Sequence, residues 1–184
     1  AGEAAERLKK LPLGWELKEA LAACAVVTKY VCGAENHGAP KKETQKLQRQ
    51  VELAVRGPLH QGRAKELLWT IVLKGERSDP EQVLAVQAFS TFIRILQKRR
   101  ETWEVFMRIW GKKDQWKVKT MARGPVQRLG QLMEKWGWQW IEPFRVIMPG
   151  DRPLQLLRDS TKWIVERAKE TCKEEIIGRM RGED

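Results

Sequence analysis

The chain has 184 residues, of which 42% are hydrophobic, and its formal net charge is +11. This length and apolar content support one domain of ordinary size with a real core, which excludes a wholly disordered chain. So large a positive charge favours contact with a polyanion such as RNA, DNA or anionic lipid. Because no run of eighteen apolar residues occurs, the sequence predicts no membrane span.

The first half of the chain is expected to be helical, because apolar residues recur three and four positions apart. A first helix is expected from Gly14 to about Val31. A second helical region starts near Pro40, a residue suited to the first turn of a helix, and extends to about residue 74. Gly57-Pro58 interrupts this region, which predicts either a kinked helix or two consecutive helices.

A long regular helix is expected over residues 80–110, because Asp79-Pro80-Glu81 supplies an N-cap, a first-turn proline and an acid near the positive end of the helix dipole. Residues 41–74 and 80–110 would then form an antiparallel hairpin with arms of about 45–50 Å. Two such hairpins can cover their apolar stripes by pairing into a four-helix bundle. The alternative is that other helices of the same chain cover both arms. The expected dimer interface comprises Leu68, Ile71, Val86, Phe89, Ile93 and Leu96.

A further helix starts at Gly124-Pro125 and ends in the Trp-rich run Trp136-Gly-Trp-Gln-Trp140. Three prolines within residues 142–155 then predict an extended arm that cannot fold back into a helix. Because Trp is enriched in contacts between chains, this corner is interpreted as an assembly contact; the alternative is that the indoles fill the core of one protomer. The expected inter-dimer contacts are Trp136, Trp138, Trp140, Phe144, Arg145 and Val146.

These elements predict an all-α fold with four consecutive parts. Residues 1–13 would form an N-terminal arm and residues 14–141 a helical assembly domain that contains the hairpin 41–110. Residues 142–155 would form the proline-rich arm between subunits, and residues 156–184 a C-terminal helical tail.

The basic residues are unevenly distributed. Between Lys98 and Arg128 there are ten Lys/Arg and three acids, which gives this segment a charge of +7. Basic groups neutralise phosphates, and an exposed indole such as that of Trp103 or Trp110 stacks on an unpaired base. The alternative is that these indoles belong to the core and the basic groups form a solvated face. The expected nucleic-acid contacts are Lys98, Arg99, Lys112, Lys113, Lys117 and Lys119.

The sequence contains no recognisable set of catalytic residues. His37 and His60 have no spaced Cys or acid partner, and no glycine-rich phosphate-binding motif occurs. The three cysteines lack CxxC spacing and are odd in number, which favours a reduced, intracellular compartment over a disulfide framework or zinc site. Glu134 and Glu142 flank the Trp-rich run and are expected to be ordinary surface acids. The sequence therefore predicts no metal, no cofactor and no enzyme activity.

The elements follow one another as a Leu11-Pro-x-x-Trp15 opening, a short helix, a long hairpin, a short helix ending in Trp140-Ile, and a proline-rich arm ending in Gly-Asp-Arg-Pro-Leu154. This order resembles the hepadnavirus core (capsid) protein family, including its non-enveloped fish relatives, the nackednaviruses. The resemblance implies that the hairpins dimerise, that the Trp-bearing helix and the arm join dimers into a shell, and that the protein occurs in the virion and in the host cytoplasm or nucleus. The chain departs from the family at Gly57-Pro58, and a mixed-charge helix stands in place of its Arg-rich tail.

The expected partners are further copies of this chain and RNA or another nucleic acid, and membrane contact is not expected of a capsid protein. Two other function classes remain open. One is a viral matrix or Gag-type helical domain whose basic face binds anionic membrane. The other is a monomeric helical RNA-binding protein.

Overall fold

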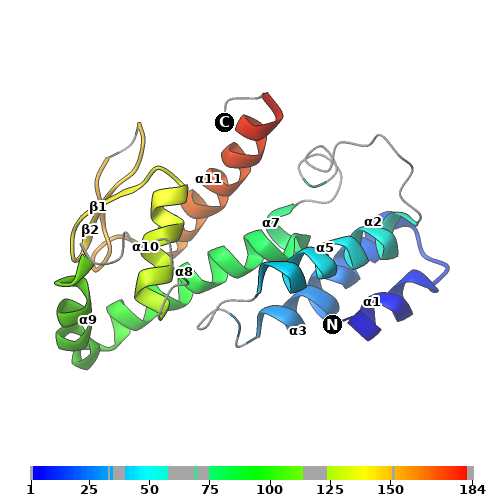
Figure 1. Ribbon diagram of the computed structural model, residues 1–184, viewed down its shortest axis with the longest axis horizontal. Helices are drawn as coiled ribbons and strands as arrows, with labels where there is room; N and C mark the ends of the chain where they lie inside the picture. Colours follow the sequence, from blue (N-terminus) through cyan, green and yellow to red (C-terminus); the bar gives the residue numbers. More distant parts are fainter. Residues whose placement is uncertain are drawn as a thin grey trace. The chain divides into compact units, whose positions relative to one another are not determined.

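A computed structural model describes residues 2–32, 34, 40–57, 69, 75–113, 124–150 and 152–181. The chain divides into two compact units. Unit 1 comprises Ala1–Glu35, Ala39–Leu84 and Lys169–Asp184, and unit 2 comprises Asn36–Gly38 and Ala85–Ala168. Most described residues are helical, as predicted, but a small antiparallel sheet adds to the expected all-α fold (Figure 1).

Unit 1 is built from helices of the N-terminal half. In chain order they are α1 (Gly2–Lys9), α2 (Trp15–Leu21), the π-helix η1 (Ala22–Val27), α3 (Thr28–Val31), α5 (Lys41–Arg56) and α7 (Gly75–Ser78). The expected N-terminal arm contains α1, which buries Ala5 and Leu8 and packs against α5. α5 is amphipathic because Leu47 and Val51 are buried at four-residue spacing. The segment predicted as one helix over 14–31 consists of three consecutive helical pieces.

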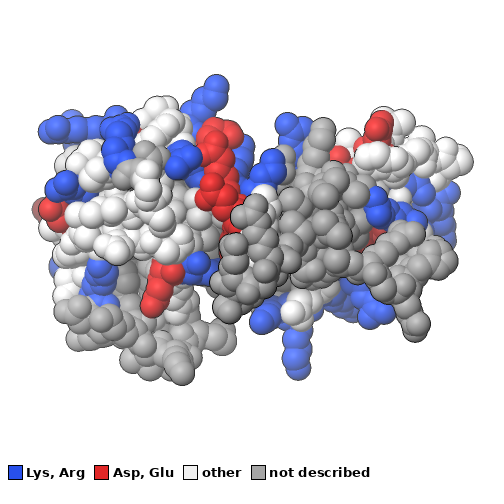
Figure 2. Space-filling view, turned by 90° about the horizontal axis from the view of Figure 1, so that it is seen from above, with Lys and Arg blue, Asp and Glu red and all other residues white. Residues whose placement is uncertain are grey.

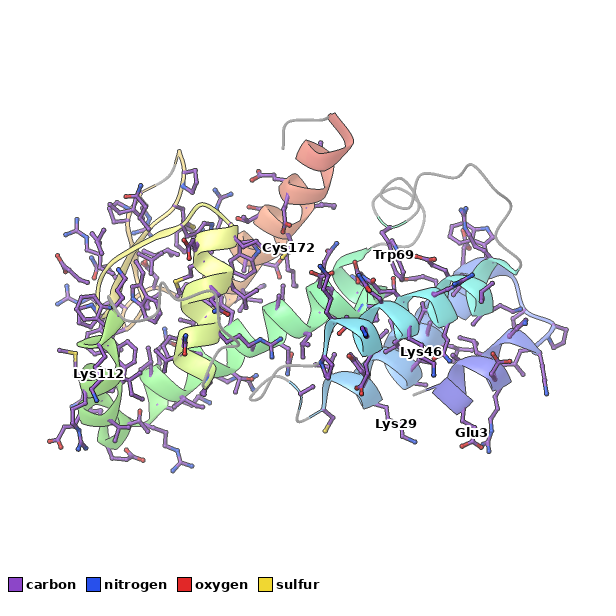
Figure 3. All side chains as sticks on the ribbon, viewed as in Figure 1. Glu3, Lys29, Lys46, Trp69, Lys112 and Cys172 are labelled. Atoms are coloured by element: carbon purple, nitrogen blue, oxygen red, sulfur yellow. The ribbon has the colours of Figure 1, made fainter. Side chains whose placement is uncertain are left out.

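The helix predicted to begin near Pro40 is α5, and it ends where the sequence predicts an interruption. Gly57 has a φ of +78°, a backbone conformation that glycine adopts without the steric cost of a Cβ. Residues 58–74 make up the rest of the same predicted arm. Among them, Trp69 is the one residue that the structure describes. Trp69, labelled in Figure 3, is buried, and its Nε1 donates to Glu52 Oε1 at 2.6 Å, which satisfies a buried carboxylate of α5.

The prediction of one continuous helix over 80–110 is wrong. The first helix, α8 (Pro80–Lys98), ends before Arg99, whose φ of −123° and ψ of 81° are not helical. The 3-10 turn η3 (Arg100–Thr102) follows and leads into a second helix, α9 (Trp103–Trp110). Side chains stabilise the break: Trp103 Nε1 donates to the Leu96 carbonyl at 2.7 Å, and the Thr102 hydroxyl donates to the Arg99 carbonyl at 2.7 Å. These bonds satisfy carbonyl groups that a helix end leaves without partners.

The predicted N-cap of α8 is confirmed. Asp79 Oδ1 accepts hydrogen bonds from the Glu81 backbone N–H at 2.9 Å and from Gln48 Nε2 at 2.6 Å, and both the Asp79 and the Gln48 side chains are buried. Asp79→Ala removes the cap and an acceptor of a buried amide, so we expect a loss of about 1–3 kcal/mol in the free energy of unfolding. Urea denaturation measures it. Asp79→Asn keeps an oxygen at the cap, so an equal loss in both variants would contradict the capping role.

Unit 2 contains α8 from Ala85 onward, η3, α9, α10 (Pro125–Lys135), three strands and the start of α11 (Thr161–Arg181). α11 is the helix predicted for the C-terminal tail, and its residues from Lys169 onward belong to unit 1. The strands β1 (Gln139–Glu142), β2 (Arg145–Ile147) and β3 (Leu154–Gln155) pair antiparallel in the order β1-β2-β3. The segment predicted as an extended arm therefore folds into a sheet within its own protomer.

An aromatic cluster fills the core of unit 2. Phe89 of α8 makes edge-to-face contacts with Trp136 and Trp138, with ring centroids 5.8 and 5.5 Å apart. Phe106 of α9 stacks on Trp140 at 5.8 Å, and Phe92 of α8 meets the same ring edge-to-face at 5.9 Å. Such pairs stabilise a core beyond the burial of their area.

Gln97 links α8 to the segment before α11. Its Nε2 donates to the carbonyls of Leu156 and Asp159, both at 2.9 Å, and its Oε1 accepts from the Thr161 hydroxyl at 2.6 Å. Gln97→Leu leaves these partners without their bonds, so we expect a loss of about 1–3 kcal/mol in stability. Thermal unfolding of this variant beside Gln87→Leu, a substitution at an exposed position of α8, measures the loss. Equal melting temperatures would show that the three bonds do not stabilise unit 2.

Candidate nucleic-acid interface

The apolar face of α8 predicted as the dimer interface is buried inside the protomer. Phe89 and Ile93 are fully buried, and Val86 and Leu96 are buried as well. The prediction that this stripe leaves apolar surface in water is wrong for these four residues. Trp136 and Trp138 pack edge-to-face on one of them, Phe89. Leu68 and Ile71, the other predicted interface residues, lie outside the described residues.

The predicted inter-dimer residues also contribute to the protomer. Trp136, Trp138 and Trp140 are 6%, 3% and 4% exposed, and Val146 is fully buried. Trp140 Nε1 donates to the Pro143 carbonyl at 3.1 Å. Phe144 and Arg145 are half-buried; the Phe144 ring contacts Trp103 and Phe106, and Arg145 pairs with Glu142 at 3.6 Å. Of the two alternatives for the indoles, the structure therefore shows the core of one protomer.

The break between α8 and α9 leaves a group of exposed cations, here called the basic corner. Its members lie at the end of α8, in η3, and on or just after α9; they are Arg94, Lys98, Arg99, Arg100, Arg108 and Lys112. Three of them, Lys98, Arg99 and Lys112, are predicted contacts, and Lys112 is labelled beside α9 in Figure 3. An ion pair joins Arg99 to Glu101 at 3.5 Å, but both side chains are at least 66% exposed, so it offsets little of the positive charge.

The remaining predicted cations differ in position. Lys113 is half-buried and donates a hydrogen bond to the Trp140 carbonyl, so it points back onto β1. Lys117 and Lys119 lie outside the described residues. Arg94, Arg100 and Arg108 belong to the basic corner but were not among the predicted contacts. Arg100 lies next to the predicted Arg99. The i,i+4 spacing of Arg94 and Lys98 on α8 was the available signal for Arg94, whereas Arg108 needed the correct orientation of α9.

The positive charge of the chain is concentrated in unit 2. Residues 85–168 contain seventeen Lys/Arg and eight Asp/Glu, a net +9 out of the +11 of the whole chain. Figure 2 shows that Lys and Arg side chains outnumber acidic ones on the face in view. A surface of this sign raises the local concentration of a polyanion and speeds its association.

Three half-buried indoles of unit 2 each lie under a cation. Arg100 lies 5.9 Å from the centroid of the Trp103 ring, Lys113 lies 5.5 Å from that of Trp110, and Arg152 lies 4.6 Å from that of Trp163. The first two pairs border the basic corner. Paired cations and aromatic faces suit single-stranded nucleic acid, which presents phosphates and unstacked bases together.

The basic corner also exposes aliphatic side chains. Val105 is 50% exposed, and Ile95, Met107 and Ile109 are also exposed, whereas Phe106 is the buried residue of α9. A continuous helix would have placed Met107 on the buried stripe. η3 breaks that periodicity and turns Phe106 inward instead.

Two further classes of site receive no support from the described residues. No group of three or more His, Cys, Asp or Glu side chains in the described ranges could hold a metal ion. No helix among those described is long and apolar enough to cross a membrane.

Comparison of the chain with models of protein families, with curated proteins and with solved structures finds no match.

Proposed function

We propose that this chain is a capsid-type structural protein that binds single-stranded nucleic acid at the basic corner and associates with further copies of itself. The observation that supports the proposal most is the concentration of charge: unit 2 has a net +9, and six of its Lys/Arg side chains are exposed around one break between helices. A polyphosphate that these cations neutralise releases its own counterions, and this release favours binding.

Unit 1 offers a set of exposed apolar side chains for self-association. The set comprises Leu11, Leu13, Trp15, Leu17 and Leu21, which are between 36% and 60% exposed. Groups of exposed apolar side chains are typical of protein–protein interaction surfaces. In this proposal unit 1 associates with other copies while unit 2 binds nucleic acid. The hairpin dimer implied by the hepadnavirus resemblance stays a prediction, since Leu68 and Ile71 lie outside the described residues.

Sedimentation velocity with and without a labelled 20-nucleotide RNA tests both parts. The protein is expected to sediment as species larger than its 21.4 kDa protomer, and the RNA to sediment with it. Leu17→Ser is expected to shift the protein toward the protomer and to leave RNA binding intact, because Leu17 is exposed on α2. A 21.4 kDa species that binds RNA would contradict self-association and support the monomeric RNA-binding alternative. Free RNA beside the protein would contradict nucleic-acid binding.

One observation favours a second candidate function, the binding of an anionic membrane surface. Ile95, Val105 and Ile109 are exposed among the cations of the basic corner, and aliphatic side chains with neighbouring Lys and Arg are typical of interfacial membrane contacts. Flotation with phosphatidylserine vesicles in the presence of competing RNA distinguishes the two. Protein that floats despite excess RNA would favour the membrane, and protein that stays with the RNA would favour the capsid-type function.

A further inference from the structure

A pocket of about 550 Å³ lies in unit 2 between the end of α10, the turn into β1, and Lys113. Its volume falls within the range of about 300–1,000 Å³ that small-molecule sites occupy. Two glycines, Gly130 and Gly137, contribute backbone in place of side chains to its wall. Gly137 has a φ of +71°, so the turn that shapes the pocket favours glycine there.

Lys113 provides a fixed donor in the pocket wall. Its Nζ donates one hydrogen bond to the Trp140 carbonyl and lies 5.5 Å from the centroid of the Trp110 ring. An ammonium group has three N–H donors, so two remain for a ligand. Because the carbonyl and the ring hold the side chain, little conformational entropy is lost when a ligand binds it.

Glu134, an exposed acid, also lines the pocket and supplies hydrogen-bond acceptors where Lys113 supplies donors. A carboxylate only accepts hydrogen bonds, and its two oxygens can accept from two neighbouring N–H groups at once. Trp138 lines the pocket as well, and its buried Nε1 has no hydrogen-bond partner among the described residues. Because that nitrogen is enclosed by protein atoms, the indole contributes an apolar surface to the pocket rather than a hydrogen bond.

We propose that this pocket binds an unpaired guanine base of the nucleic acid held at the basic corner, an inference that rests on the proposed function. Guanine carries the acceptors O6 and N7 beside the donors N1–H and N2–H₂. Lys113 donates to the acceptors, as lysine does to guanine in general, and Glu134 accepts from both donors. Adenine presents an N6 amino group beside an acceptor at N1, so the carboxylate would bond one donor and face a lone pair.

Fluorescence anisotropy with the full chain and labelled heptamers of RNA tests the inference. The probes are seven uridines and the same strand with guanosine, inosine or adenosine at its centre. We expect the guanosine strand to bind about tenfold more tightly than the uridine and adenosine strands, within the discrimination that a bidentate base contact provides. Inosine lacks the N2 amino group, so its strand should bind with intermediate affinity.

Glu134→Gln is expected to abolish the preference for guanosine, whereas Glu142→Gln, which makes the same change in charge, is expected to keep it. The second variant removes an exposed acid of β1 that does not line the pocket. Equal affinities of the wild-type chain for the guanosine and adenosine strands would overturn the inference and leave the proposed function standing. A preference that persists in Glu134→Gln would overturn the assignment of the site. Failure of every strand to bind would overturn both the inference and the proposed function.

Discussion

Replacing Lys98, Arg99 and Lys112 together by Glu is expected to weaken the binding of single-stranded RNA about 100-fold near physiological salt. All three side chains are exposed, so the substitutions remove cations from the basic corner without disturbing the aromatic core of unit 2. The loss follows because each phosphate contact contributes through counterion release, and the introduced carboxylates also repel the strand. Filter binding or anisotropy with a 20-nucleotide RNA measures the effect.

A matched control distinguishes the effect of where the cations lie from the effect of the net charge of the chain on RNA binding. Lys41, Lys42 and Lys46 are exposed on α5 in unit 1, and their replacement by Glu changes the net charge of the chain by the same amount. Figure 3 labels Lys46 on this helix. We expect the control to lower the affinity by only a few-fold. Equal losses in the two triple variants would show that the chain binds RNA by its overall charge, and would contradict a site at the basic corner.

Trp140→Ala is expected to lower the free energy of unfolding by about 3–5 kcal/mol, as is typical of buried aromatic residues cut to alanine. The substitution removes the ring that stacks on Phe106 at 5.8 Å and meets Phe92 edge-to-face, together with the hydrogen bond to the Pro143 carbonyl. In a chain of this length, each kcal/mol corresponds to about 2–4 °C in Tm. Thermal unfolding followed by near-ultraviolet circular dichroism, which reports on packed indoles, measures the change.

Met107→Ala is the control, because it truncates a large apolar side chain that is 44% exposed on α9 and lies outside the proposed self-association set. Its effect on stability is expected to be small. The comparison also distinguishes the two interpretations that the sequence leaves open for the Trp-rich run. A Trp140→Ala variant that melts like the wild type but no longer self-associates would show that this indole is an assembly contact, contrary to its burial in the protomer.

The helix starts could be predicted from the sequence because their signals are local. Asp79-Pro80 and Gly124-Pro125 each begin a helix as expected, and Pro40 precedes α5. The end of α8 at Lys98 could not be predicted, because it depends on hydrogen bonds from the side chains of Thr102 and Trp103 that form only once the chain has turned. Apolar spacing remained compatible with an unbroken helix through this region.

The sheet was missed for a related reason. Its strands are two to four residues long, too short for alternation to be recognised, and prolines lie between them. Pairing brings Trp140, Val146 and Leu154 onto one buried row, which the sequence alone could not show. The long-range fold thus determines whether a Trp belongs to the core or to an interface.

The two candidate sites differed in how well they could be predicted. The cations Lys98, Arg99 and Lys112 follow from a local excess of charge, and the structure places all three on the surface. The pocket joins Lys113 to residues from α10 and β1, so it depends on tertiary contacts. Glu134 has no distinguishing pattern in the sequence; only its place in the pocket wall separates it from other surface acids.

The salt dependence of RNA binding by the wild-type chain tests the central claim most directly. If the six cations of the basic corner contact phosphates, the logarithm of the association constant should fall against the logarithm of the salt concentration with a slope of about −4 for a single strand. The variant with Glu at 98, 99 and 112 should show a slope shallower by about 2. A slope near zero, or the same slope in both proteins, would contradict binding through the basic corner.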